Sequence, residues 1–279
     1  MSENLNSPSP LQPLSIGNVV SASVRLYRSR LKTYLRLAVI AHLWAIVPVY
    51  GWAKYAAMSG LISRLAFGEL IYQPETVAAA QEQVERRLWS FLRVSFQVGL
   101  SILVIYFALA IVAGIAAGIL GVLLGAIFGN STAIVAIITI LIFLLVFGFI
   151  ILGITWFYAR WSVAEVPLAV EENINGAESV ARSWELTKSS AIRVQGVVLV
   201  AGVVTAPILI LFNYGPALIL NVIEQGTTLY WIIYSISLIL SFVGGIFVMP
   251  FWQTIKAVLY CDLRSRREGL GLQLRDGDL

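Results

Sequence analysis

The chain has 279 residues, of which 59% are hydrophobic and only 12% are charged, and its formal net charge is +4. Its mean hydropathy is +0.86, whereas a soluble domain carries roughly 25% charged residues. This composition excludes a water-soluble globular protein. Most of the chain is needed for membrane spans, so we expect one domain and no separate catalytic domain. Cys261 is the single cysteine, which excludes an intrachain disulfide.

Residues 1–14 are rich in Ser, Pro and Asn and predict a disordered tail. This segment lacks the basic region that opens a cleavable signal peptide, so we expect the first span itself to direct insertion. A single membrane domain is expected over residues 15–263. Residues 264–279, basic and then acidic, are expected to form a cytoplasmic tail.

An N-terminal amphipathic helix is predicted to follow, with Ser15 as its N-cap. Its apolar positions fall on one stripe at helical spacing: Ile16, Val20, Val24, Tyr27 and Leu31. Basic residues lie off this stripe and just after it, and we expect them to form a surface for anionic lipid: Arg25, Arg28, Arg30, Lys32 and Arg36. The helix would then lie in the membrane interface. The alternative is a packed cytoplasmic helix.

The next segment, residues 37–67, is apolar but interrupted by His42, Pro48, Lys54 and Arg64. Two crossings here would place both chain termini on one side of the membrane. All of the 19 Lys and Arg residues except Lys54 would then face the cytoplasm, in agreement with the positive-inside bias. Each half of this hairpin has only about 14 apolar residues, fewer than the roughly 20 of a full span. We therefore expect the hairpin to be short, tilted or broken.

A long uncharged run follows, since residues 94–159 contain no Asp, Glu, Lys, Arg or His. The run is too long for one span and is broken at residues 129–131, so it predicts spans at 95–128 and 132–158. Two more apolar segments predict spans at 194–213 and 229–255. The sequence thus predicts an all-α integral membrane protein, a six-span helical bundle in the cytoplasmic (inner) membrane with both termini in the cytoplasm.

Two cytoplasmic segments are also predicted to be helical. The first begins near Pro74 and places Glu82 where it can pair with Arg86. The second begins with Asn175 and Glu178, at capping-box spacing. A narrow apolar stripe runs along this second helix: Ala177, Val180, Ala181 and Trp184. We expect the helix to lie in plane under the bundle; the alternative is a solvated arm.

Four glycines of the third span share one face, because intervals of four and three residues match the helical repeat: Gly114, Gly118, Gly121 and Gly125. Such a strip of small residues lets another helix approach closely within a membrane. We expect either the fourth span of the same chain or a second subunit to pack there, which leaves a homo-oligomer open.

The spans offer little for catalysis or metal binding. The 15 Asp and Glu residues fall in the predicted loops, tail and cytoplasmic helices, whereas ion-coupled transporters place such groups inside the membrane. The lone histidine, His42, lacks partners for a metal site. We expect it to make a structural hydrogen bond, and Gln97, Thr139 and Asn213 to bond between helices. No nucleophile elbow or phosphate loop occurs, so we expect no catalytic residue, metal, cofactor or enzyme activity.

A set of residues in the second half has a recognisable spacing: Ala177, Ser183, Leu186, Thr187, Lys188, Tyr260, Asp262, Leu263 and Arg264. Together with residues 167–171, they resemble the glycerophosphoryl diester phosphodiesterase membrane-domain family and related six-span membrane proteins. Ser189 stands where a glycine is common in that family. The resemblance implies a membrane bundle. The soluble phosphodiesterase barrel of some members is not expected here, and no catalytic residue is implied.

Taken together, these features predict a non-enzymatic membrane protein, such as a scaffold, assembly or envelope-homeostasis factor. Its expected partners are anionic membrane lipids and a protein at the cytoplasmic face, and no nucleic acid. The alternative is an uncoupled transporter of small molecules or lipids that uses the broken hairpin and the glycine-lined span as a path. A packed interior would favour a scaffold, and a continuous cavity would favour transport.

Overall fold

The computed structural model describes residues 14–129 and 132–269, and these residues form helices and connecting turns without a strand. The predicted tail up to residue 13 and residues 270–279 lie outside the described part. The helices are α1 (Ile16–Ser29), α2 (Leu31–Ala45), α3 (Tyr50–Leu70), α4 (Val77–Glu85), α5 (Leu88–Phe128), α6 (Thr132–Trp161), α7 (Glu165–Val170), α8 (Gly176–Thr187), α9 (Ala191–Leu209), the π-helix η1 (Ile210–Tyr214), α10 (Gly215–Leu220) and α11 (Thr228–Glu268).

Four helical stretches in the described residues are long and apolar enough to cross a membrane: Leu88–Phe128, Val135–Val170, Ala191–Leu220 and Thr228–Glu268. They overlap the four spans that the sequence predicts after residue 94, and they are consistent with a membrane protein. The predicted first hairpin is not among them. Its two helices, α2 and α3, instead pack against each other and against α11.

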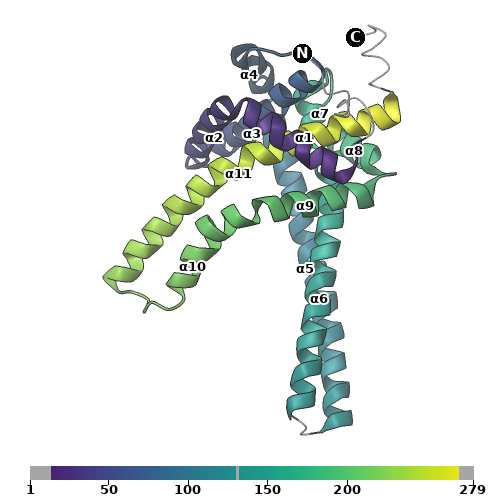
Figure 1. Ribbon diagram of the computed structural model, residues 1–279, viewed down its shortest axis with the longest axis vertical. Helices are drawn as coiled ribbons and strands as arrows, with labels where there is room; N and C mark the ends of the chain where they lie inside the picture. Colours follow the sequence, from purple (N-terminus) through teal and green to yellow (C-terminus); the bar gives the residue numbers. More distant parts are fainter. Residues whose placement is uncertain (1–13, 130–131, 270–279) are drawn as a thin grey trace, which may run out of the picture.

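The molecule consists of a head and two helical arms (Figure 1). The first arm comprises residues 99–128 of α5 and 132–155 of α6, which run side by side. The second arm comprises residues 203–220 and residues 228–248 of α11. Residues 221–227 form the turn at the tip of the second arm, and Gly129 ends α5 at the tip of the first. The head contains the remaining described residues, and α9 crosses α6 where the first arm leaves the head.

The core of the head forms around α3. Fifteen of the 21 residues of α3 are buried, and the helix packs against α2, α5 and α11. Its small residues allow this close packing. A Cβ atom on Gly60 would lie 2.3 Å from the ring of Phe91, which is only 1% exposed. The apolar residues of α3 are therefore buried against protein on most sides of the helix.

The predicted hairpin places Lys54 on the external side of the membrane and Glu85 on the cytoplasmic side. The structure contradicts this separation. The Nζ atom of Lys54 lies 2.7 Å from Oε1 of Glu85 in α4, so a bilayer cannot separate the two residues. The hydrogen bond from Lys54 also holds the pKa of Glu85 below its ordinary value. Likewise, the ring of Tyr50 in the hairpin lies 6.4 Å from that of Trp89 at the start of α5. The turn of the hairpin and the start of α5 thus belong to one head.

The first amphipathic helix is packed, as in the alternative interpretation. Ser15 caps α1 as predicted and accepts a hydrogen bond from the Asn18 amide at 3.2 Å. However, α1 ends at Ser29, and the exposed Leu31 begins α2. The buried face is rotated from the predicted stripe and comprises Val19, Val20, Ser23 and Leu26. It packs against α9 and α11, so protein covers the apolar face of α1.

The second arm is held together by close contacts between η1 and α11. The hydroxyl of Ser241 donates a hydrogen bond to Oδ1 of Asn213 at 2.6 Å, which confirms the interhelical bond predicted for Asn213. A Cβ atom on Gly244 would lie 2.7 Å from Cβ of Phe212, so only glycine permits this approach. The prediction for Thr139 is wrong, because its hydroxyl bonds to the Val135 carbonyl in its own helix.

Candidate functional site

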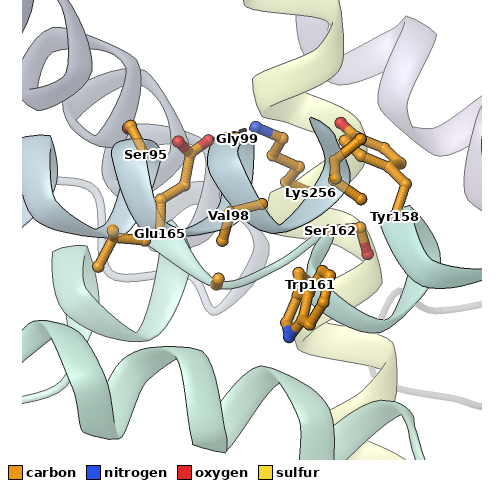
Figure 2. A pocket seen from close by; sticks show the side chains of 11 residues that line it. Ser95, Val98, Gly99, Tyr158, Trp161, Ser162, Glu165 and Lys256 are labelled. Atoms are coloured by element: carbon orange, nitrogen blue, oxygen red, sulfur yellow. Dashed lines mark hydrogen bonds and ion pairs between the residues drawn. The ribbon is translucent and has the colours of Figure 1, made fainter. Parts of the chain in front are cut away.

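A partly buried ion pair lies where the arms meet the head (Figure 2). The Nζ atom of Lys256 in α11 lies 2.6 Å from Oε1 of Glu165 at the start of α7. Their side chains are 15% and 12% exposed. Tyr158 at the end of α6 and Ser95 in α5 lie on either side of the pair, so four helices surround it.

Two cavities open onto this ion pair. One has a volume of about 310 Å³ and extends along α5 to Ile102, with Val98 and Gly99 on its wall. The other has a volume of about 490 Å³ and lies beside α3, with Tyr55, Ser59 and Gln253 on its wall. Both include Ser95, Glu165 and Lys256 in their linings. The two cavities are therefore neighbouring, mostly apolar recesses that share the polar groups of Ser95, Glu165 and Lys256.

The chemistry available in these recesses is limited. The ammonium and the carboxylate neutralise each other, and the polar groups beside them are hydroxyls and an amide. Gln253 already accepts a hydrogen bond from the Ser63 hydroxyl at 2.8 Å. No group of three or more His, Cys, Asp or Glu residues within residues 14–129 and 132–269 could hold a metal ion. The recesses could accommodate a small polar or amphiphilic molecule.

The motif residues of α8 attach this helix to the end of α6. The hydroxyl of Ser183 donates to the Arg160 carbonyl at 2.9 Å, and Thr187 donates to the same oxygen at 3.3 Å. Ser179 donates to the Ala164 carbonyl at 2.5 Å. The last carbonyls of a helix have no partner within the helix, so Ser183 and Thr187 supply the donors that the Arg160 carbonyl near the end of α6 lacks. Ser179 instead binds the turn between α6 and α7.

The capping box of α8 is confirmed, with Asn175 and Glu178 bonded reciprocally. The predicted apolar stripe is only partly correct, because Ala177 and Ala181 are exposed. The hydroxyl-bearing residues of α8 are buried instead, since their hydrogen bonds to α6 make burial possible. Sequence hydropathy gave no indication of this, because serine and threonine count as polar.

A ring of charged groups joins α8 to the end of α11. Glu171 accepts hydrogen bonds from Arg182 and from the Tyr260 hydroxyl. Arg182 also pairs with Glu268 at 2.5 Å, and Arg264 donates to Glu268 at 2.9 Å. The guanidinium of Arg264 lies 5.7 Å from the centre of the Tyr260 ring. The motif residues Tyr260 and Arg264 therefore have structural partners.

Asp262 anchors the N-terminal end of the described chain. Its fully buried carboxylate accepts a hydrogen bond from the Leu14 amide at 2.7 Å and pairs with Arg193 and Arg266. Both arginines also donate to the Leu14 carbonyl at 2.8 Å. The neighbouring motif residues Leu186 and Leu263 are buried in the core, and Lys188 is exposed. The domain thus includes Leu14, and α11 continues past the predicted boundary at residue 263.

The basic residues predicted to face anionic lipid are divided between two environments. Four of them are exposed: Arg25, Arg28, Lys32 and Arg36. Arg30 pairs instead with Glu69 at the end of α3. The chain therefore has a basic surface on α1 and α2 that is smaller than the sequence indicated.

The glycine strip does not pack against the fourth span. Among the described residues, a Cβ atom at Gly114, Gly118, Gly121 or Gly125 would meet no atom within 4 Å. The helix α6 packs on a different face of α5, where Gly153 lies close to Leu109. The described residues of the fourth span therefore do not contact this strip, and a second subunit there stays a prediction.

His42 has a structural environment. Its Nδ1 atom lies 2.8 Å from the Ala38 carbonyl of the same helix, and its ring packs edge-on against Tyr55 and Phe242 at 5.3 Å. Burial lowers the pKa of His42 below its ordinary value. A Cβ atom on Gly245 would lie 2.5 Å from Nε2. The histidine therefore fills the contact between α2, α3 and α11.

Comparison with protein-family models, with curated proteins and with solved structures found no match to this chain. The resemblance to the phosphodiesterase membrane-domain family stays a prediction that depends on the motif residues. These residues lie close together around α8 and the end of α11, and most of them have structural partners.

The pairing of Glu165 with Lys256 was not predicted from the sequence. A signal was available, because Lys256 is the single charged residue between Glu224 and Asp262, and Glu165 is the single one between Arg160 and Glu171. An isolated charge in an apolar segment usually has a partner. The sequence could not show that these two residues, 91 positions apart, would meet.

Proposed function

We propose that this protein is a non-enzymatic scaffold or assembly factor of the cytoplasmic membrane. In this proposal the two arms lie in the bilayer, the head lies at its cytoplasmic face, and the arms bind a helical membrane partner. The observation that supports it most directly is the uncovered apolar surface of the first arm. In the most apolar 18-residue stretches of its two helices, 6% and 0% of the residues are buried.

Four crossings agree with the charge distribution better than six. With α5, α6, α9 to α10 and α11 as spans, all 19 Lys and Arg residues lie on the side of the head, Lys54 included. The connections on the opposite side, residues 129–131 and 221–227, contain no Lys or Arg. The positive-inside bias then favours a cytoplasmic head and cytoplasmic termini. Reporter insertions at Trp52 and Lys188 should both read cytoplasmic, and an insertion at Glu224 should read external.

The fate of the polar groups also supports a scaffold. The acids described above each pair with a cation or cap a helix, and the hydroxyls of α8 bond to backbone. Such groups hold elements of the head together. What remains for recognition is the apolar arms and the basic surface on α1 and α2, which would contact anionic headgroups.

The proposal can be tested by site-specific photo-crosslinking in intact membranes. A photoreactive residue would replace Leu145 on the first arm, which is 74% exposed, or Leu218 on the second, which is 67% exposed. The matched control is Tyr72 in the head, which is 73% exposed. We expect protein adducts of one defined mass from the arm positions and none of that mass from Tyr72. Adducts with lipid alone from both arms would contradict a protein partner.

A second candidate function is uncoupled transport of a small or lipid-like molecule. The observation in its favour is that two cavities meet at the ion pair Glu165–Lys256. The path considered from the sequence is less favourable, because α2 and α3 lie in the head, away from the glycines of the first arm (Figure 1). Flux measurements in proteoliposomes would distinguish the two functions. Transport requires flux above that of empty vesicles, and a scaffold gives none.

A further inference from the structure

A large basic cavity lies at the corner between α8 and α9, and none of its lining residues belongs to the ion pair Glu165–Lys256. Its volume is about 800 Å³. The connection Lys188–Ser190 and the first turn of α9 form one wall, and Arg266 of α11 and Trp156 of α6 form others. The proposed scaffold function does not use this cavity.

Cations outnumber acids around the cavity. Lys188, Arg193 and Arg266 line it, and Arg267 is held at the Ser189 hydroxyl by hydrogen bonds of 3.2 and 3.4 Å. In the part of the chain that the structure describes, Asp262 is the one carboxylate paired with these four cations. The Asp262 carboxylate neutralises part of the positive charge of Arg193 and Arg266. Among the described residues, Lys188 and Arg267 have no carboxylate partner. An excess of positive charge in a recess attracts an anion.

The backbone adds to this preference. Ser190 is the N-cap residue of α9, but its side chain makes no capping hydrogen bond. The first amides of a helix have no partner within the helix, and the helix dipole favours negative charge at this end. The Nε atom of Arg193 is also buried without a hydrogen-bond partner. Several donors in and beside the cavity therefore have no acceptor.

The position of the cavity indicates what kind of anion it fits. A candidate span begins at Ala191, and Ile192 in the cavity wall is 80% exposed. Trp156 lies at the same end of α6, and tryptophan is enriched at the level of lipid headgroups. The cavity is thus basic on the side of the head and apolar on the side where α9 starts its candidate span. A soluble phosphate would use the first property only, whereas a phospholipid would use both.

We infer that this cavity binds the phosphate of an anionic phospholipid, with the acyl chains along the outer surfaces of α6 and α9. Lys188, Arg267 and the first amides of α9 contact the phosphate. Arg193 and Arg266 stay on Asp262 and supply long-range attraction. The site differs from the basic surface of α1 and α2, because its cations surround a cavity and lie beside exposed apolar side chains of the spans.

The test uses the full chain purified in detergent and native mass spectrometry with added phosphatidylglycerol or phosphatidylcholine. We expect preferential retention of phosphatidylglycerol, and a loss of affinity on the order of tenfold or more in Lys188→Gln/Arg267→Gln, because each cation near a headgroup contributes about fivefold. The matched control is Arg86→Gln/Arg93→Gln, which removes the same charge from an exposed surface elsewhere in the head and should change affinity less than twofold.

Three results would overturn the inference. One is equal retention of the two lipids by the wild-type chain. Another is an equal loss in the two double variants, which would indicate a diffuse electrostatic effect. The third is displacement of phosphatidylglycerol by glycerol phosphate or inorganic phosphate at concentrations similar to the lipid, which would indicate a soluble ligand. Lys188→Gln alone should leave the fold intact, because Lys188 is exposed. Its affinity for phosphatidylglycerol should still fall about fivefold.

Discussion

The contact between Gly60 of α3 and Phe91 of α5 gives the sharpest test of how the head is packed. In Gly60→Ala the new methyl carbon would lie 2.3 Å from Cε1 and 2.8 Å from Cζ of Phe91. Packed carbon atoms prefer separations of about 3.5–4.0 Å, so the overlap is about 1 Å. Phe91 is 1% exposed and cannot swing into open space. The helices must separate or the ring must leave its rotamer.

The expected magnitude follows from two opposing effects. Overpacking of this kind costs roughly 1–3 kcal/mol, while alanine in a helix is favoured over glycine by about 1 kcal/mol. Gly121→Ala in the first arm is the matched control, because it gains the second effect and meets no described neighbour. Gly60→Ala should therefore be less stable than Gly121→Ala by about 1–3 kcal/mol. The same comparison contrasts a real packing contact with the predicted glycine strip.

The chain itself supplies the assay. Cys261 is the sole cysteine and is 1% exposed, so a thiol-reactive fluorescent dye reports when the head unfolds in detergent. Phe91→Leu combined with Gly60→Ala should recover part of the loss, measured as a coupling energy between the two sites. If Gly60→Ala and Gly121→Ala unfold at the same temperature, or if the double variant shows no coupling, the packing argument fails.

The remaining predictions use the same assay. Lys256→Gln leaves the partly buried Glu165 carboxylate without its partner and should destabilise the head by roughly 1–3 kcal/mol. Lys256→Met with Glu165→Leu should cost less, and equal losses would contradict a stabilising pair. Ser183→Ala should cost about 1 kcal/mol by removing the bond to the Arg160 carbonyl, and an unchanged unfolding temperature would contradict it. Burial lowers the pKa of His42, so the neutral imidazole contributes its full stability above pH about 6.5, and this contribution is lost as the pH falls through the lowered pKa. His42→Gln should therefore reduce the stability difference between pH 8 and pH 5.5, and an unaltered difference would show that His42 is not the titrating group.

Much of the helical layout followed from hydropathy and capping. The uncharged residues 94–159 predicted two long helices because no soluble fold hides such a run. The capping box of Asn175 and Glu178 and the pair Glu82–Arg86 depend on residues three or four positions apart, so local spacing was sufficient to predict them. Both pairs are present in the structure.

The first hairpin shows where hydropathy fails. A helix of 15 residues such as α2 is apolar for the same reason whether lipid or protein surrounds it, and a short apolar stretch is more often a buried core helix than a span. The contact between Lys54 and Glu85 distinguishes the two cases, but it joins residues 31 positions apart. Counting charges on each side of the membrane could not show this contact.

The glycines illustrate the same limit. Gly114 to Gly125 form a regular pattern, yet no described residue packs on them. Gly60, Gly244 and Gly245 form no pattern, yet each allows a contact that a Cβ atom would block. A pattern in one helix shows that close approach is possible, and only the tertiary structure shows where a neighbour is present.

The charged residues at the end of α11 join this helix to earlier elements of the head. Lys256 pairs with α7, Asp262 pairs with α9, and Glu268 pairs with α8. Each pair joins the last helix to an element that precedes it by a long stretch of chain. The pairs therefore form only when the final helix has docked, and they fix the origin of both arms. In the proposed function, recognition of other molecules would therefore fall to the arms and to the exposed cations at their base.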